Sequence, residues 1–339
     1  MNQGVRSCVK HPALAPVALS CAAAASLAGC GSAEEPPPAP EPAASPQLSE
    51  RPAGRLVRVG TEPEGLAADP RTGMIAVALR NPDRLVLVRG RSGRVARRVP
   101  LPESARHLQL APGGRVLAPA ERADLLAEVP LAGGRPATTA VGDFPHDAAE
   151  AGGRILVANE GDDTVTIVEG GRPVATLEAP QGPGGVAAAG SLAAVVGVRA
   201  RRVALYDLAA RRQIGEVEGG VGSTHVVADE RHAYVADTEG EAILVYRLRP
   251  ELEFIDRANL PGSPYALALD RRRGELWVTL TESNEVVRLE LSGGAPRRKE
   301  SYPTVRQPNS VAVDERSGGV FVAGREGSKL QILGSEVSR

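Results

Sequence analysis

The chain has 339 residues, with 40 Lys and Arg against 41 Asp and Glu, for a formal net charge of −1. A nucleic-acid-binding protein normally presents a strongly basic face, so this balance argues against that class. Aromatic residues make up only 3%, and branched aliphatic side chains must therefore fill whatever core the chain forms.

The first 29 residues have the features of a secretory signal peptide. Arg6 and Lys10 supply a positive start, and residues 13–28 are mostly Ala, Leu and Val. A membrane-spanning helix needs about 20 strongly apolar residues, whereas this stretch is shorter and is interrupted by Pro16. We therefore expect residues 1–29 to be removed, which changes the net charge to −3.

The end of this leader, Leu27-Ala28-Gly29-Cys30, resembles the bacterial lipobox. The resemblance implies cleavage before Cys30, a lipid on its thiol, and a protein anchored on the extracytoplasmic side of the cell membrane, at the outer face of the plasma membrane or in the periplasm. The alternative is an ordinary cleaved signal. Cleavage also removes Cys8 and Cys21, so one mature chain can form neither a disulfide nor a cysteine-based zinc site.

Residues 30–54 are rich in Pro, Ala, Glu and Ser and contain little apolar bulk. Such a composition is typical of a tether, and the 24 residues after Cys30 can extend roughly 70 Å at about 3.1 Å per residue. We expect the folded part to comprise residues 55–339.

A repeat of about 40 residues runs through this part. Each unit begins with Pro or a small residue, followed by short apolar strands separated by Gly- and Pro-containing turns. The units begin at Pro63, Ala105, Pro145, Pro183, Ser223, Pro264 and Pro308, at intervals of 42, 40, 38, 40, 41 and 44 residues.

A period near 40 with four strands per unit predicts an all-β, seven-bladed β-propeller of four-stranded antiparallel blades. The last unit has room for only three strands, and an unpaired edge there would be open to association with other chains. We therefore predict that the N-terminal strand 55–60 completes the last blade and closes the ring. We expect a monomer.

Particular segments resemble the YVTN repeat of seven-bladed, YncE-like propellers. The stretch RILVANEGDDTVTIVEGGRPVATLEAP at 154–180 shows it best, and AYVADTEGEAILVYRL at 233–248 repeats it more loosely. The units from Ala105 and Pro183 depart most, because they lack the Asn or Asp that ends the second strand. The resemblance implies a fold but no activity, since its motif residues build strands and turns.

In a propeller, the loops before the first strands and the turns between the second and third strands share one face, where the channel mouth is the usual ligand site. The candidate rim residues are those that follow each repeat start, together with an arginine trio in the fourth blade. They are Glu64, Arg106, His107, His146, Asp147, His225, Tyr265, Asn309, Arg199, Arg201 and Arg202.

Two interpretations of the rim compete. His107, His146 and Asp147 suit a divalent transition metal, whereas a polar rim can equally bond only neighbouring loops and water. We expect His107 and His146 to meet, and His225 to lie too far around the ring to share an ion with them. The arginine trio suits an anionic group or a solvated surface. No cofactor is predicted, and a divalent metal at His107, His146 and Asp147 is the alternative.

The mature sequence contains no G-x-S-x-G, H-E-x-x-H, P-loop or EF-hand spacing and no free thiol nucleophile. We therefore expect a membrane-tethered binding or scaffold propeller that recognises a small molecule or an envelope protein at its channel mouth. The alternatives are a lactonase-like hydrolase, since seven-bladed lactonases resemble this repeat, and a metal-binding or redox accessory protein.

Overall fold

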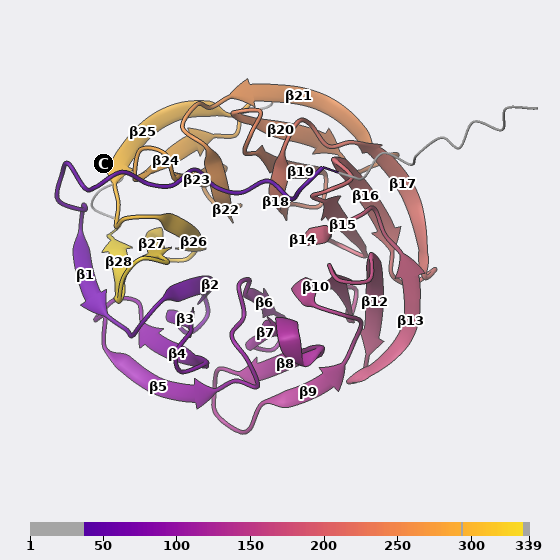
Figure 1. Cartoon of the computed structure of the whole chain (residues 1–339), viewed down its shortest axis with the longest axis horizontal. Coiled ribbons are helices and arrows are strands. Elements are labelled where there is room, and N and C mark those ends of the chain that lie inside the picture. Colours follow the sequence, from indigo (N-terminus) through magenta and orange to yellow (C-terminus); the bar gives the residue numbers. More distant parts are fainter. Residues whose placement is uncertain (1–36, 293, 335–339) are drawn as a thin grey trace, which may run out of the picture. The chain divides into compact units, whose positions relative to one another are not determined.

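The computed structural model describes residues 37–292 and 294–334, which form seven sheets arranged in a ring (Figure 1). Each sheet has four antiparallel strands. Within the described residues the only helical element is the short 3-10 turn η1 (Glu121–Ala123). The predicted all-β, seven-bladed propeller is confirmed.

The blades follow one another along the chain, and in each the first strand lies at the axis and the fourth at the outside (Figure 1). Blades 1 to 3 comprise β2 (Pro63–Asp69), β3 (Met74–Leu79), β4 (Arg84–Arg89) and β5 (Val95–Pro100); β6 (Gln109–Ala111), β7 (Arg115–Ala120), β8 (Leu125–Pro130) and β9 (Ala137–Ala140); and β10 (Pro145–Ala151), β11 (Arg154–Asn159), β12 (Thr164–Glu169) and β13 (Arg172–Glu178). Blades 4 to 6 comprise β14 (Pro183–Ala189), β15 (Leu192–Gly197), β16 (Arg202–Asp207) and β17 (Arg212–Glu218); β18 (Ser223–Ala228), β19 (His232–Asp237), β20 (Ala242–Arg247) and β21 (Glu253–Asn259); and β22 (Pro264–Asp270), β23 (Glu275–Leu280), β24 (Glu285–Glu290) and β25 (Arg297–Pro303). Blade 7 comprises β26 (Pro308–Asp314), β27 (Gly319–Gly324), β28 (Lys329–Leu333) and β1 (Arg55–Arg58).

The two ends of the propeller meet in one sheet. The N-terminal strand β1 pairs antiparallel with β28, and beyond it the Val59 N–H donates to the Ser328 carbonyl at 2.9 Å. The predicted closure by residues 55–60 is confirmed, with the regular strand itself ending at Arg58. The pairing removes the open edge that a three-stranded last blade would expose.

The repeat starts predicted the inner strands well. Six of the seven first strands begin at the predicted residue; the exception is blade 2, where β6 begins at Gln109 rather than Ala105 and has only three residues. The residues between β5 and β6 therefore form a loop, and Figure 1 shows this connection reaching toward the centre of the ring.

Branched aliphatic side chains fill the space between blades, as the low aromatic content requires. Between blades 4 and 5, for example, Val203 and Leu205 share one buried cluster with Leu244 and Tyr246. The Tyr246 hydroxyl also donates to the Glu218 carbonyl of the preceding outer strand at 2.8 Å. Packing and hydrogen bonding together therefore fix each blade against the next.

The Asn and Asp residues that end the second strands build turns, as the repeat predicts. Buried Asp237 accepts hydrogen bonds from the N–H groups of Gly222 at 2.6 Å and Gly240 at 3.3 Å. Buried Asn159 donates to the hydroxyls of Thr164 and Thr166, both at 2.9 Å. The Asp237 carboxylate and the Asn159 amide nitrogen are therefore occupied within their turns, whereas the Asn159 Oδ1 is buried and has no hydrogen-bond partner among the described residues.

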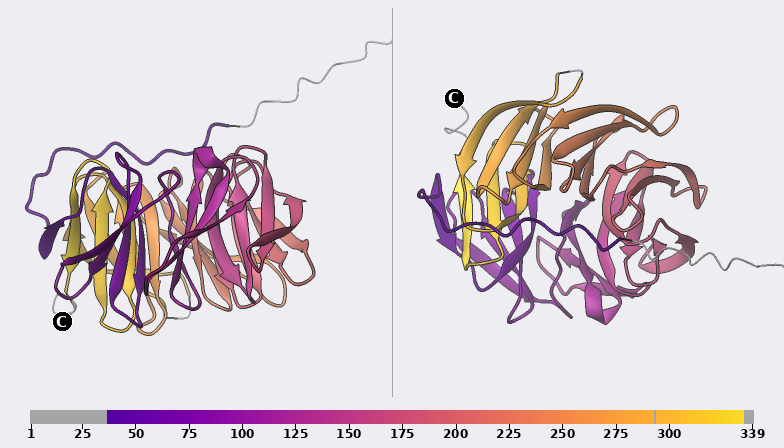
Figure 2. Two further views of the ribbon diagram at one scale, coloured as in Figure 1. Left: turned by 90° about the horizontal axis from the view of Figure 1, so that it is seen from below. Right: turned by 45° about the horizontal axis from the view of Figure 1, so that its top comes forward.

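Residues 37–52, here called the strap, cross one flat face of the ring before β1 begins (Figures 1 and 2). This face carries the loops before the first strands and the turns between the second and third strands, which bond one another; the Thr281 N–H, for example, donates to the Ser263 carbonyl at 3.3 Å. We call it the strap face, and the other the opposite face. The strap belongs to the segment for which composition predicted a tether, and its middle part packs closely, with Pro40 and Ser45 buried.

No helix in the described part of the chain is long and apolar enough to cross a membrane. The predicted signal peptide and Cys30 lie outside the described residues.

Candidate functional site

Four aromatic rings form a layer across the axial channel beneath the strap. The ring centroids of His107 and His146 lie 4.7 Å apart, those of His107 and His225 4.8 Å apart, and those of His225 and Tyr265 4.3 Å apart. His107 and His146 meet, as predicted, and His225 contacts His107 although its place in the sequence puts it three blades further around the ring. First strands converge at the axis, and the loop before β6 carries His107 inward, so distance around the rim does not separate these side chains.

His146 is the charged member of this layer. Its Nδ1 lies 3.0 Å from the Glu160 carboxylate and 3.2 Å from that of Glu121, which η1 positions. Burial alone would lower the pKa of His146, but the two carboxylates outweigh burial and raise it to about 9. His146 is therefore a cation at neutral pH, and its interaction with Glu160 in turn holds the pKa of that carboxyl below its ordinary value despite burial.

His107 and His225 are kept neutral. Burial lowers the pKa of both, and the neighbouring His146 cation lowers them further, to about 3 for His225 and well below the ordinary value for His107. The Nδ1 of His225 is buried and has no hydrogen-bond partner among the described residues. One imidazolium and two neutral imidazoles thus lie in contact.

Asp147 is close to these rings in sequence but is occupied elsewhere. Its carboxylate accepts the N–H groups of Val186 at 2.9 Å and Ala148 at 2.8 Å, and Gln109 approaches it at 3.3 Å. Burial raises the pKa of Asp147 to about 6, against these hydrogen bonds, which lower it. Within the described residues no group of three His, Cys, Asp or Glu side chains is arranged to hold a metal ion.

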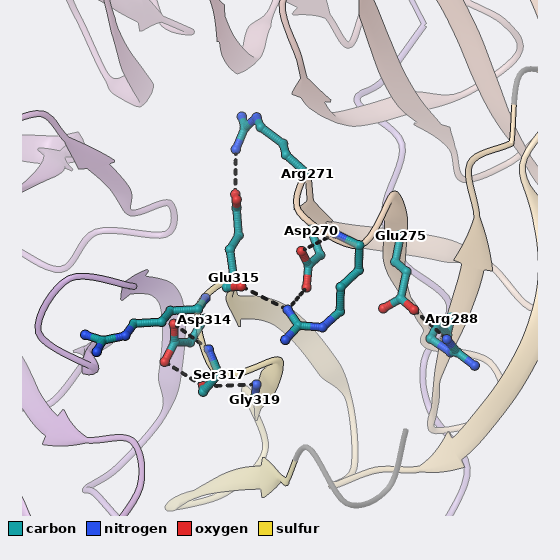
Figure 3. Close-up of polar contacts among 10 residues, drawn as sticks. Asp270, Arg271, Glu275, Arg288, Asp314, Glu315, Ser317 and Gly319 are labelled. Carbon is teal, nitrogen blue, oxygen red and sulfur yellow. Dashed lines mark hydrogen bonds and ion pairs between the residues drawn. The ribbon is translucent and has the colours of Figure 1, made fainter. Parts of the chain in front are cut away.

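A channel of about 440 Å³ runs from the layer to the opposite face. His107, His225 and Asn309 line its inner end, and small or branched aliphatic residues of the first strands line its wall: Ala67, Ala68, Ala266, Ala268, Val311 and Ala312. At the outer mouth, Arg271 and Glu315 form an ion pair at 2.9 Å, and Figure 3 shows the two side chains pointing toward each other. The small residues predicted for the first strands keep this channel open.

The remaining rim carboxylates and guanidinium groups of blades 1 and 2 are paired beside the layer. Glu64 bonds Arg80 at 2.6 Å, and Arg106 lies 3.2 Å from Glu121. The proximity of Glu121 raises the pKa of Arg106 although burial acts to lower it. In these ion pairs the guanidinium groups of Arg80 and Arg106 balance the charges of the Glu64 and Glu121 carboxylates.

The arginine trio of blade 4 is paired as well. Arg199 lies 3.3 Å from Asp163 and Arg201 3.2 Å from Glu239, while Arg202 lies 2.9 Å from Glu216. Arg201 also donates to the carbonyl of Pro38 in the strap. All three arginines are therefore paired with carboxylates of this chain, and Arg201 also helps to hold the strap.

Tyr265 and Asn309 complete the predicted rim. Burial raises the pKa of Tyr265, and nearby Glu41 of the strap raises it further. The Asn309 Oδ1 is buried and has no hydrogen-bond partner among the described residues. Sequence reasoning missed Glu121 and Gln109, because both lie in blade 2, whose sequence departs most from the repeat.

No family model matches this sequence, and no curated protein matches it. Its fold is similar to that of solved structures that share 13–15% identity. A chain of Kuenenia stuttgartiensis hydrazine synthase aligns with a TM-score of 0.70 at 15% identity, covering 83% of this chain and 97% of that one. A chain of the mitotic checkpoint complex aligns with a TM-score of 0.70 at 13% identity, covering 87% and 95%. A catalytically inactive histidine-to-alanine variant of virginiamycin B lyase from Staphylococcus aureus, solved with quinupristin, aligns with a TM-score of 0.67 at 14% identity, covering 83% and 99%. These similarities establish the propeller fold and leave function to be argued from the site.

Proposed function

We propose that this protein is a lipid-anchored, extracytoplasmic propeller that binds a small uncharged molecule in its axial channel. The observation that carries the proposal is the inner end of the channel, where neutral His107 and His225 and the side-chain amide of Asn309 line a cavity of about 440 Å³. Binding cavities for small molecules have this size and combine an apolar wall with a few convergent polar groups.

The electrostatics select an uncharged ligand. The Asp147 carboxylate is saturated by main-chain and amide donors, and Arg271 at the mouth is paired with Glu315. A charged ligand would lose its hydration without gaining a free counterion, which is unfavourable. A neutral molecule can instead form hydrogen bonds with the uncharged polar side chains that line the channel, among them the amides of Gln109 and Asn309 and the hydroxyl of Ser310.

The proposal is tested by a thermal-shift screen of the full mature chain against matched sets of uncharged, anionic and cationic small molecules. We expect stabilising compounds in the uncharged set, and their effect should disappear in Asn309→Leu and His225→Phe. His232→Phe, a change on the rim of the opposite face, is the matched control. Hits confined to charged compounds, or hits that persist in both channel variants, would contradict this assignment.

A second candidate function is acid–base catalysis. His146, with its pKa raised to about 9, contacts His107, whose pKa is lowered, and opposite shifts in neighbouring groups are a feature of catalytic sites. Among similar folds, virginiamycin B lyase is inactivated by a histidine-to-alanine change. In hydrolysis of a lactone, water would attack the carbonyl carbon and give its proton to neutral His107, while the His146 cation would protonate the leaving alkoxide. This is testable with a panel of lactones; turnover that survives His107→Gln would exclude it.

The lipid anchor is proposed from Cys30 alone, with the strap setting its reach. Because Arg201 already bonds Pro38 on the ring, only residues 31–36 separate Cys30 from the strap. Six residues extend roughly 20 Å at most, compared with roughly 70 Å for a free tether ending at residue 54. The propeller is then held close to the membrane.

A further inference from the structure

The strap is held mainly through four residues, Ala43-Ala44-Ser45-Pro46, which lie along blades 6 and 7. The Ala43 N–H donates to the Ser263 hydroxyl at 3.0 Å, and the Ser45 N–H donates to the Gln307 amide oxygen at 2.8 Å. In return, the Gln307 amide nitrogen donates to the Ala43 carbonyl at 3.1 Å. One buried glutamine thus pairs with the strap main chain much as a neighbouring β-strand would.

Two further groups extend this contact. The Asn284 amide nitrogen donates to the Pro46 carbonyl at 3.0 Å, and the buried Ser45 hydroxyl donates to the Thr281 carbonyl. The Arg306 guanidinium bonds the Ser45 carbonyl at 3.2 Å. Every polar main-chain group of residues 43, 45 and 46 that is able to bond the ring does so.

The equivalent turns of other blades show that Asn284 forms one hydrogen bond more than the fold requires. At the same turn, Asp124 and Asp163 cap the next loop by accepting the N–H of Phe144 at 3.1 Å and of Gly182 at 2.7 Å. Asn284 performs the same cap, accepting the Gln307 N–H at 3.0 Å. Because Asn284 carries an amide in place of a carboxylate, it retains a donor, and that donor is directed at the strap.

We propose that the rim of blades 6 and 7, formed by Ser263, Thr281, Asn284, Arg306 and Gln307, is a recognition site for an extended peptide of small residues ending in Ser-Pro. Gln307 and Asn284 bind the main chain of the peptide through hydrogen bonds. The site selects a small polar side chain at the Ser45 position, where only 4% of the residue is exposed and the hydroxyl donates to the Thr281 carbonyl. The strap is its resident occupant, and another polypeptide segment of this chemistry competes for it.

The test uses the full mature chain and a labelled synthetic peptide corresponding to residues 40–49. Amide hydrogen exchange of residues 43–46 is measured first. We expect slow exchange in the wild type and fast exchange in Ser45→Arg, whose side chain cannot be buried there. A strap that stays protected in Ser45→Arg would overturn the selection for a small residue and with it the proposal.

Peptide binding is then measured by fluorescence anisotropy at peptide concentrations up to about 1 mM, because the strap in its own chain has the advantage of a covalent link. We expect binding to Ser45→Arg, none to the wild type, and about tenfold weaker binding to the double variant Ser45→Arg/Asn284→Asp. Asn284→Asp is the matched change because it keeps the cap and removes only the donor to the peptide. Equal binding to both variants, or no binding to a folded Ser45→Arg chain, would overturn the proposal. A peptide with Ser45 replaced by Arg is the negative control.

Discussion

The imidazole of His107 lies 4.8 Å, centroid to centroid, from that of His225, although blades 2 and 5 are separated by two others along the chain. The contact exists because both side chains reach the axis, and it places two neutral rings beside one imidazolium. The charge distribution in this layer gives the first predictions.

At pH 7 we expect His146 to be doubly protonated and His107 and His225 to be neutral. The glutamates around His146 raise its pKa to about 9, whereas burial lowers the pKa of His225 to about 3. Nitrogen-15 NMR of the imidazoles between pH 5 and 10 checks this, with single His→Gln variants assigning the signals. Three histidine signals that titrate together near pH 6.5 would contradict it.

Glu121→Gln should lower the pKa of His146 by about one unit or more. The change removes one of the two carboxylates that stabilise the imidazolium and leaves the shape of the side chain almost unchanged. Glu160→Gln should act in the same direction, because its carboxylate lies 3.0 Å from the same nitrogen. Glu62→Gln on the same face is the control and should leave the His146 titration where it is.

The raised pKa of His146 also predicts how stability depends on pH. A group whose pKa is higher in the folded state contributes full stabilisation below its unfolded pKa of about 6.5, and loses it as pH rises through 9. The slope in this window is at most about 1.4 kcal/mol per pH unit. Urea unfolding of wild type and His146→Gln at pH 6.5 and 9.5 measures this, and equal losses in both proteins would contradict the assignment.

Ring closure predicts a sharp difference between two N-terminal truncations. A chain that begins at residue 53 lacks the strap but keeps β1, whereas a chain that begins at residue 60 also exposes the edge of β28, including buried Leu330 and Ile332. We expect the shorter chain to unfold at least about 10 °C below the longer one, or to aggregate. Thermal unfolding followed by circular dichroism checks this; coincident curves would show that β1 contributes little.

Cys30→Ser should release the protein from membranes, because the thiol is the proposed site of lipidation. Fractionation of cells expressing wild type and variant, with a Cys8→Ser control inside the leader, measures the effect. Membrane association that persists in Cys30→Ser would mean that the leader is not a lipoprotein signal.

The sequence predicted the architecture because the same pattern of apolar strands and turns recurs in every unit, from the one at Pro63 to the one at Pro308. Only one predicted strand, at residues 55–60, was then left to complete the last sheet. The repeat also gave most of the candidate rim residues, because these follow the starts of its units. It predicted that His107 and His146 meet, but it did not predict that His225 contacts His107, since the radial position of His107 depends on an irregular loop that begins where blade 2 departs from the repeat.

The strap was the other feature that composition could not reveal. A segment of Pro, Ala and Glu lacks the apolar bulk to fold alone, and this composition is typical of a tether. Its place on the ring depends on partners far along the chain, such as Gln307 and Asn284, whose amides become significant only when the two segments are seen together.

The pairing of β1 with β28 links the first strand of the propeller to the last. Blade 7 cannot be assembled until β28 has been synthesised, so a chain truncated before Lys329 would leave β1 without its partner. Such non-local pairing slows folding, since the loop must close before the contact forms. A chain that ends before β28 would therefore leave the ring unclosed, with the backbone of β1 unpaired and accessible to proteases.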